Sequence, residues 1–154
     1  QKIGDVLVAS QIIPYEQQRI GPRINFRGAI PPSSTHLLNR FENAHDWRFT
    51  RPDGKICNVI IGPILSGEKL VDDPGFKATL FEAFPHAVGG EMEGAGFCAA
   101  CGRVGAAWIL VKSISDWGDG TKSSQHQPLA AAAAASLVHH ILSKKRALDS
   151  LAKK

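Results

Sequence analysis

Three short apolar runs constrain the fold of this chain more than any other feature. They are GDVLVASQII near the start, CNVIIGPILSG in the middle and AAWILVKSIS further on, and β-branched residues are frequent in each. Continuous apolar runs of this kind are typical of strands that are buried on both faces. Segments with helical patterns lie between and after the runs, so the sequence predicts an α/β fold.

Four segments carry these helical patterns. PPSSTHLLNRFENAHDWRF offers Ser33 or Ser34 as an N-cap, and DPGFKATLFEAF offers Asp73 as an N-cap with Pro74 at the first helical position. EGAGFCAACGRVG is a helix of small residues, and Pro128 opens PLAAAAAASLVHHILSKK, whose alanines are strong helix formers. In the second segment, the apolar residues spaced as one stripe are Phe76, Leu80, Phe81 and Phe84.

The order of elements predicts where a ligand would bind. The short run AVGGEM comes before EGAGFCAACGRVG and AAWILVKSIS, which is a strand, a helix and a strand. Such a unit closes with a right-handed crossover and parallel strands, so we expect both strands to end at the same edge of the sheet. In open α/β sheets, ligands bind outside the carboxyl ends of the strands. We therefore expect this edge to carry Glu91, Met92 and Glu93 together with Ser115 and Asp116.

The middle run ends at the same predicted edge with Ser66, Gly67 and the segment Glu68–Leu70. Asp116 follows a run that should be buried, so its carboxyl group is partly withdrawn from water and suited to general acid work. Glu93 has two readings from the residues alone. It either binds a ligand at this edge or stabilises the N-terminus of the following helix, where a carboxylate is favoured.

The composition indicates one globular domain, residues 1–154. With 44% hydrophobic and 21% charged residues, this length can bury a single core. The formal net charge of +4 comes partly from a basic tail at 144–154, which we interpret as a solvated helix end and not as a nucleic-acid surface. Neither a run of about 18 apolar residues nor a signal-peptide pattern is present, so we expect a cytoplasmic protein without a membrane partner.

The cysteines and histidines predict no metal site. Three cysteines are an odd number, which favours a reducing compartment. Cys98 and Cys101 form a Cys-x-x-Cys pair, but the second pair of ligands that a zinc site needs is missing, so we interpret them as core residues. His139 and His140 are adjacent and cannot present two imidazoles to one metal from a helix. We expect no cofactor.

Residues 89–120, GGEMEGAGFCAACGRVGAAWILVKSISDWGDG, resemble the Met-Glu and Ser-Asp signature of the nucleoside phosphorylase and nucleosidase superfamily. KIGDVLVAS resembles the Gly-Asp-led central strand of that family, and IIGPILSGEKL resembles its strand ending in Ser-Gly-Asp or Ser-Gly-Glu. The resemblance covers most of residues 2–145, apart from 14–50, where we expect a variable loop and helix. It implies a three-layer αβα sandwich with a mixed, largely parallel central sheet.

The resemblance implies cleavage of the N-glycosidic bond of a purine nucleoside or nucleotide. Carried over to this sequence, Glu93 accepts hydrogen bonds from the ribose 2′ and 3′ hydroxyls, and Met92 packs against the sugar. Glu91 supports the ribose side of the site and ranks below Glu93. This division suits a reaction that passes through an oxocarbenium-like sugar, because the enzyme gains most by stabilising an electron-poor ribose and a departing base.

For the base, the resemblance implies that Asp116 contacts purine N7 and protonates it as the bond to C1′ breaks, and that Ser115 helps to place the base. Leu70 and Val71 fall where family members line the base pocket. The nucleophile stays open at this point, because either water or phosphate as a co-substrate is compatible with these residues. The family's Gly-rich loop, which holds phosphate or guides water, would precede the Gly-Asp strand.

The chain is therefore expected to be the C-terminal two-thirds of the family domain, and inactivity of the fragment alone is one outcome that we allow for. The PYEQQ stretch, the DWGDG loop and the QPLAAAAAA helix resemble versions of the domain attached to signalling or defence-type multidomain proteins. An alternative function is thus a non-catalytic module that senses a nucleoside or nucleotide within a larger protein. We expect homo-oligomers and further domains in a longer parent chain.

Overall fold

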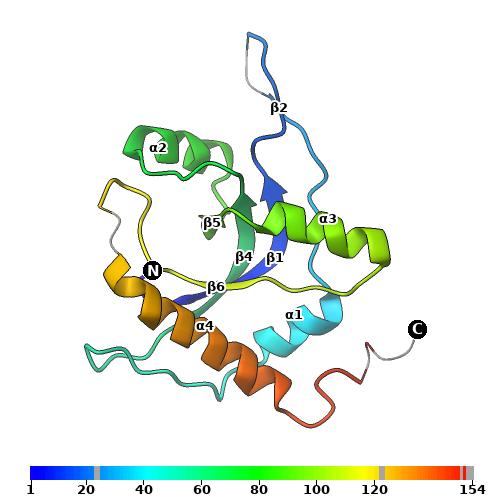
Figure 1. Cartoon of the computed structure of the whole chain (residues 1–154), viewed down its shortest axis with the longest axis vertical. Helices are drawn as coiled ribbons and strands as arrows, with labels where there is room; N and C mark the ends of the chain where they lie inside the picture. The colour runs from blue at the N-terminus through cyan, green and yellow to red at the C-terminus, as the bar shows by residue number, and fades with distance from the viewer. Residues whose placement is uncertain (23–24, 122–123, 150, 152–154) are drawn as a thin grey trace.

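The computed structural model of the protein describes residues 1–22, 25–121, 124–149 and 151. Within these ranges, the main sheet has the strand order β5-β4-β1-β6 (Figure 1). β1 (Val6–Pro14) runs parallel to β4 (Val59–Ser66), and β4 runs parallel to β5 (Gly89–Glu91). β6 (Val111–Ser113) pairs with the other side of β1 and is antiparallel to it. The sheet is therefore mixed and largely parallel, as predicted.

The predicted parallel crossover from the AVGGEM strand to the AAWILVKSIS strand is wrong. β5 and β6 lie at opposite edges of the sheet, and β6 ends with Ser113 opposite Val6 at the amino end of β1. The reason is the direction of α3 (Gly94–Val104), which lies across the strands in Figure 1 and not along them. This helix carries the chain from one edge of the sheet to the other without returning it to the amino ends of the strands.

Helices cover both faces of the sheet, which gives the predicted three layers. α1 (Thr35–Glu42) and α4 (Gln127–Leu142) lie on one face, and α3 lies on the other (Figure 1). The side chains of β1 alternate between the two faces: Val6 and Val8 pack with residues of α1 and α4, whereas Leu7 and Ala9 pack with Cys98 of α3. This alternation with a period of two residues explains why the run reads as continuously apolar.

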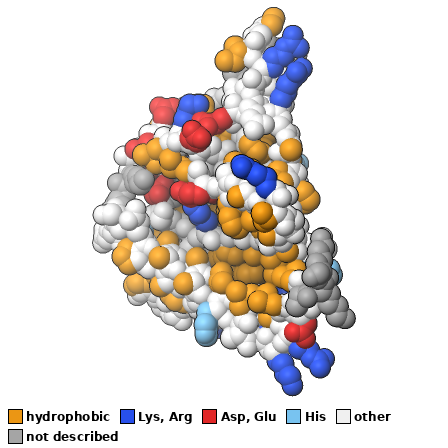
Figure 2. Space-filling model, turned by 45° about the vertical axis from the view of Figure 1, so that its right-hand side comes forward, with side chains coloured by type: hydrophobic (Ala, Val, Ile, Leu, Met, Phe, Trp, Pro, Cys, Tyr) orange, Lys and Arg blue, Asp and Glu red, His pale blue; other side chains and the backbone are white. Residues whose placement is uncertain are grey.

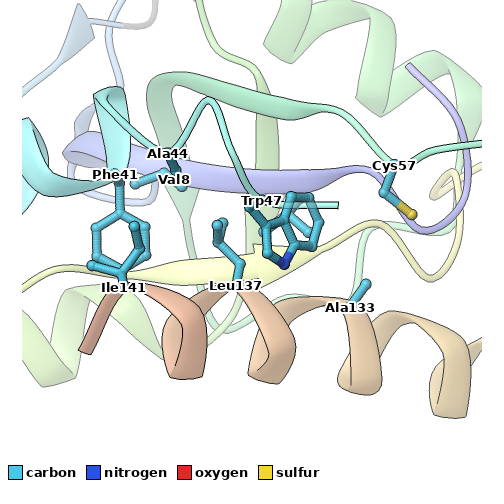
Figure 3. Close-up of a cluster of buried hydrophobic side chains, with 9 residues drawn as sticks. Val8, Phe41, Ala44, Trp47, Cys57, Ala133, Leu137 and Ile141 are labelled. Atoms are coloured by element: carbon cyan, nitrogen blue, oxygen red, sulfur yellow. The ribbon is translucent and has the colours of Figure 1, made fainter. Parts of the chain in front are cut away.

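The core on the α1 and α4 side shows why the alanine-rich segment is an ordered helix. Ala133, Leu137 and Ile141 recur every fourth residue along α4 and point toward the sheet and α1 (Figure 3). Ala133 and Leu137 are fully buried, and Phe41 of α1 lies beside Ile141. Four-residue spacing places side chains on one face of a helix, so α4 buries a stripe against the sheet. A short 3₁₀ turn, η1 (Ser124–His126), precedes this helix.

The cysteines lie in or next to the core, as the sequence predicts. All three are free thiols, and Cys57 and Cys98 are buried. Burial raises the pKa of the Cys98 thiol to about 11, with smaller contributions from Cys101 and Glu91. A thiol with so high a pKa carries little thiolate at neutral pH and is a poor nucleophile.

α2 (Pro74–Ala83) begins as predicted but buries less than its apolar stripe suggests. The Asp73 side chain accepts a hydrogen bond of 2.6 Å from the backbone N–H of Phe76, and Pro74 occupies the first turn. Only Leu80 of the helix is buried, whereas Phe76 and Phe81 keep 37% and 48% of their surface exposed. The helix packs beside the carboxyl ends of the strands instead of on a sheet face, so most of its stripe faces outward.

Residues 14–22 and 25–32 form a projecting arm, visible at the top of Figures 1 and 2. The sequence predicts a loop here, but β2 (Gln18–Arg19) and β3 (Asn25–Phe26) pair as a short antiparallel ladder. Arg23 and the last residues of the predicted basic tail lie outside the described residues. Among the described helices, none is long and apolar enough to cross a membrane.

Candidate functional site

A cavity of about 460 Å³ lies beside the start of α3. Its walls come from the loop after β4, helix α2, β5 with the start of α3, and the segment from β6 to Gly118. A volume of a few hundred Å³ suits a small organic ligand. The sequence-predicted site residues that line this one cavity are Leu70, Val71, Glu91, Met92, Glu93, Ser115 and Asp116.

The curvature of the sheet explains how residues from its two edges reach one cavity. Leu7 of β1 lies so close to Gly89 of β5 that a Cβ at Gly89 would be 2.4 Å from its side chain, although β4 separates the two strands in the sheet. Strands twist in a fixed sense, and the twist accumulates across a sheet. β5 is thereby brought over the half of β1 that pairs with β6. The predicted residues line one cavity because the sheet is curved, and not because their strands share a carboxyl edge.

The Glu91 side chain caps the N-terminus of α3. Its side chain is only 2% exposed, and its Oε2 atom accepts hydrogen bonds from the backbone N–H groups of Glu93 (2.8 Å) and Gly94 (2.7 Å). The hydroxyl of Ser66, at the end of β4, accepts the next N–H, from Ala95, at 2.8 Å. The capping role that the sequence allowed for Glu93 thus belongs to Glu91, and protein groups already occupy these helix-start donors.

Glu93 points its carboxylate outward into a more open environment. Its side chain is 70% exposed and pairs with the ammonium group of Lys112 on β6. The hydrogen bond from Lys112 lowers the pKa of Glu93 below its ordinary value. An ionised carboxylate can only accept hydrogen bonds, which is what a partner with paired hydroxyl groups requires.

Sequence reasoning missed Lys112, although a signal was present. Lys112 is the single charged residue within AAWILVKSIS, and a charge inside an otherwise apolar strand needs a partner or a route to water. The structure supplies the partners at the cavity wall, where the Lys112 Nζ atom contacts Glu93 and lies 3.7 Å from Glu91 Oε2.

Asp116 stands at the other end of the cavity and has neutral partners. The hydroxyl of Ser115 donates to its Oδ2 atom at 3.0 Å, and the backbone N–H of Gly118 donates to Oδ1 at 3.1 Å. Gly118 has a φ of 58°, and a Cβ there would lie 2.8 Å from the carbonyl oxygen of Val71. Only glycine fits this left-handed turn, which folds the backbone back onto the Asp116 carboxylate.

Two contacts tie the Asp116 loop to the loop that carries Leu70 and Val71. Asp72 accepts the backbone N–H of Gly120 at 2.9 Å, and the Lys77 ammonium group of α2 donates to the carbonyl oxygen of Trp117 at 2.6 Å. Neither Asp72 nor Lys77 stands out in the sequence, because both look like ordinary surface charges on a helix and its approach. The contacts hold the two loops against each other in the wall of the cavity.

The end of β1 holds the loop after β4 from behind. Tyr15 lines the cavity and is 3% exposed, and its ring occupies the space that a side chain at Gly67 would need. Glu16 accepts the backbone N–H of Glu68 at 2.9 Å and pairs with Lys69 at 2.9 Å. Lys69 and Leu70 therefore reach the cavity, as predicted for this strand end, while Ser66 is buried behind it.

In the described part of the chain, no group of three or more His, Cys, Asp or Glu side chains is arranged to hold a metal ion. The polar groups of the cavity wall include carboxylates, ammonium groups and hydroxyls; Glu93 and Lys112 form one part of this wall, and Asp116 and Ser115 form another. This arrangement suits an uncharged ligand portion with hydroxyl groups next to a portion that can take up a proton.

A comparison with known families identifies the family of this chain. Residues 1–143 match the Phosphorylase superfamily, which is nearly the whole chain. The chain belongs to this superfamily. Its mixed, largely parallel sheet with flanking helices is therefore a family fold, in agreement with the resemblance seen in the sequence.

Curated relatives include nucleosidases. A Death domain-containing ATP nucleosidase of Amphimedon queenslandica is 38% identical over 95% of this chain and 31% of its own length. A 5′-methylthioadenosine/S-adenosylhomocysteine nucleosidase of Haemophilus influenzae is 32% identical over 89% of this chain and 60% of its own length. The chain thus spans about a third of the first relative and about three-fifths of the second.

Solved structures of the superfamily share the fold. The 5′-methylthioadenosine/S-adenosylhomocysteine nucleosidase of Neisseria meningitidis, in complex with methylthio-immucillin-A, superposes with a TM-score of 0.76 at 20% identity. The match covers 94% of this chain and 63% of that structure. At this level of identity the similarity shows a common architecture.

Proposed function

We propose that this chain forms the sugar and base sides of a site that cleaves the N-glycosidic bond of an adenine nucleoside or nucleotide. The observation that carries the proposal is that Glu93 and Asp116 line one and the same cavity. The first carboxylate is ionised beside Lys112, and the second has neutral partners. The two ends thus have the properties that the two halves of a nucleoside require.

In the proposed mechanism, Glu93 accepts hydrogen bonds from the ribose 2′ and 3′ hydroxyls, and Met92 packs against the sugar. Asp116, in its protonated form, gives its proton to N7 of the base while the bond between C1′ and the base breaks. The sugar then carries oxocarbenium character, which the ionised Glu93 stabilises through the hydroxyl groups. Ser115 orients the Asp116 carboxyl group through the 3.0 Å hydrogen bond.

The base would lie between Asp116 and the loop that carries Leu70 and Val71. Leu70 is 55% exposed, so its apolar surface is available to a planar ligand. The contacts of Asp72 and Lys77 with the Asp116 loop keep the two walls of this base pocket in register. Gly118 supports the same arrangement, because its lack of a side chain lets the two loops touch at the carbonyl group of Val71.

Water is the proposed nucleophile and ATP the proposed substrate. The support comes from the relatives, because the curated proteins matched over most of this chain are nucleosidases, and the one with 38% identity acts on ATP. Hydrolysis would release free adenine and leave ribose triphosphate, whereas phosphorolysis would place a phosphate on C1′. The two reactions therefore differ in whether phosphate is required and in the sugar product.

The test uses the complete protein that contains this chain. ATP, adenosine and 5′-methylthioadenosine are incubated in buffer with and without phosphate, and released adenine is separated by chromatography. Adenine release from ATP without phosphate is the expected result. Release that needs phosphate would replace hydrolysis by phosphorolysis. Undiminished release after the substitution Asp116→Asn would sink the proposed acid role.

In a second candidate function, the cavity binds the same ligand but does not cleave it. It is favoured by the relative from Amphimedon queenslandica, whose name includes a death domain and of which this chain matches only 31%. In this case the cavity would sense a nucleotide for the rest of a multidomain protein. Calorimetry that shows binding of ATP or adenosine with no adenine release would support the sensor and contradict the enzyme.

A further inference from the structure

Lys112 lies near two carboxylates that differ in burial and in hydrogen-bond partners. Its Nζ atom contacts the Glu93 carboxylate and lies 3.7 Å from Oε2 of Glu91. A charge-assisted hydrogen bond between an ammonium group and a carboxylate is about 2.8 Å long. The hydrogen bond with Glu93 is therefore formed, whereas the ion pair with Glu91 is about 1 Å too long for a hydrogen bond.

Of the two carboxylates, Glu91 would gain more from a nearby cation. Its side chain is 2% exposed, against 70% for Glu93. Its Oε2 atom has two backbone donors, but its Oε1 atom is buried without a hydrogen-bond partner among the described residues. A carboxylate that is removed from water is costly unless cations and donors compensate it, whereas an exposed one is solvated at little cost.

The Glu93 carboxylate has two competing partners in the proposed function, the Lys112 ammonium group and the ribose hydroxyls. If its carboxylate binds the ribose hydroxyls, as in the proposed function, the oxygen that now faces Lys112 is needed by the substrate. The ammonium group and the ribose would then compete for one acceptor. An exposed ion pair contributes little stability, so the substrate can displace the lysine from Glu93 at small cost if the ammonium group has another anion within reach.

We propose that Lys112 moves from Glu93 to Glu91 when the ribose binds. The lysine then acts as a positioning residue that holds Glu93 ionised and oriented in the free site, releases it to the sugar hydroxyls, and compensates the buried Glu91 carboxylate. A shift of about 1 Å suffices, and the lysine exchanges its hydrogen bond to one carboxylate for a hydrogen bond to the other. The inference rests on the proposed function, because it assigns the ribose to Glu93.

The substitutions Glu91→Gln and Lys112→Met, alone and together, test this exchange through KM for ATP. Glutamine keeps the shape of Glu91 and an oxygen for the backbone donors, but it removes the charge that would receive Lys112. We expect E91Q to raise KM about tenfold with kcat changed less than about twofold, because the lysine then stays on Glu93 and competes with the ribose. Adding K112M to E91Q should bring KM back toward that of the parent, because the competitor is gone.

A purely structural role of Lys112 predicts the opposite sign. If the lysine only orients Glu93, K112M should raise KM further in the E91Q background, and this result would overturn the exchange. K112R, which keeps the charge and the reach, should keep KM within about threefold of the parent. A KM for K112R as high as that of E91Q would count against the proposal.

A structure with bound adenosine provides a readout that does not depend on how well E91Q folds. Lys112 Nζ should lie within about 3 Å of the Glu91 carboxylate and have left Glu93. Lys112 still paired with Glu93 beside a bound ribose would refute the exchange while leaving the proposed function intact. A parent protein that neither binds adenosine in calorimetry nor releases adenine from ATP would overturn both.

Discussion

The two ends of the cavity hold carboxylates in contrasting ways. At the start of α3, Glu91 and Glu93 are surrounded by backbone donors and the Lys112 ammonium group, on a rigid strand-to-helix junction. At the other end, Asp116 lies in a loop, and its partners are a hydroxyl group and one backbone N–H. The first end therefore has a charged partner, and the partners at the second end are neutral.

The difference shows how one cavity can treat two halves of a ligand differently. The hydrogen bond from Lys112 lowers the pKa of Glu93, so this carboxylate stays an acceptor to a lower pH, which suits hydroxyl groups. Neutral partners orient Asp116 without neutralising it, which suits proton transfer. Each half of the comparison can be tested by a substitution that removes the property assigned to one end.

The largest effect is expected for Asp116→Asn. Asparagine keeps the size and one oxygen of the side chain but cannot deliver a proton to the base, so kcat for adenine release should fall by roughly 10²- to 10⁴-fold. Chromatographic measurement of adenine with ATP as substrate gives kcat. Asp119→Asn is the matched control, because Asp119 lies in the same loop but bonds to Thr121. Equal losses in both variants would mean that only loop structure was damaged.

Glu93→Gln should have the next largest effect. Hydrogen bonds to a charged group are worth about 1.5–3 kcal/mol, so loss of the charge should lower kcat/KM by roughly 10- to 100-fold. Steady-state kinetics with ATP measures the change. Glu68→Gln is the control, because Glu68 is also exposed and negative but is not part of the cavity wall. An E93Q variant with the parent's kcat/KM would remove Glu93 from the proposed ribose site.

The sequence predicts the layers of the fold better than the path of the chain between its elements. The apolar runs and the caps at Asp73 and Pro128 predict the layers, because burial and helix starts are encoded locally. The path of α3 is not encoded locally, and the prediction that β6 lies parallel to its neighbours was wrong. The predicted residues nevertheless meet, because the twist of the sheet brings β5 over β1.

The roles of the two glutamates also depend on three-dimensional context. Their spacing of two residues does not say which one is buried. Glu91 is buried because it turns back to the N–H groups of Glu93 and Gly94, and Lys112 joins them from a distant strand. Contacts between segments far apart in the chain, such as Glu16 with Glu68 and Lys69, are likewise invisible to local patterns.

Gly118→Ala tests how strictly the Asp116 end depends on its backbone. The added Cβ would lie 2.8 Å from the Val71 carbonyl oxygen in a turn with a φ of 58°. We expect a loss of about 1–3 kcal/mol in the free energy of unfolding, measured by urea denaturation. Gly96→Ala is the control at the other end, because a Cβ at Gly96 in α3 meets no atom within 4 Å.

Gly96→Ala should leave stability unchanged or raise it by up to about 1 kcal/mol, since alanine is the better helix former. The two substitutions add the same methyl group, so opposite signs would confirm that the loop end depends on glycine while the helix end tolerates a side chain. A G118A variant as stable as the parent would show that the loop can relax around the added group.

The smallest expected effect is a shift of the acidic limb of the pH profile in Lys112→Met. The hydrogen bond from Lys112 lowers the pKa of Glu93, so this carboxylate stays ionised to a lower pH in the parent. Without the lysine, the pKa of Glu93 rises, and the ionised form is lost at a higher pH as the pH falls. The acidic limb of kcat/KM, which reports groups of the free enzyme, should therefore move to higher pH.

The shift should be small and sensitive to salt, because the Glu93 side chain is mostly exposed and solvent screens its pair with Lys112. Profiles of parent and K112M at low and high ionic strength measure it, and the difference between them should shrink in high salt. Lys112 pairs with the two glutamates, whereas Asp116 accepts from Ser115 and Gly118, so K112M should leave the basic limb of the profile in place. If both limbs moved together, the two ends of the cavity would be electrostatically coupled. The assignment of hydroxyl binding to Glu93 and of proton donation to Asp116 would then be wrong.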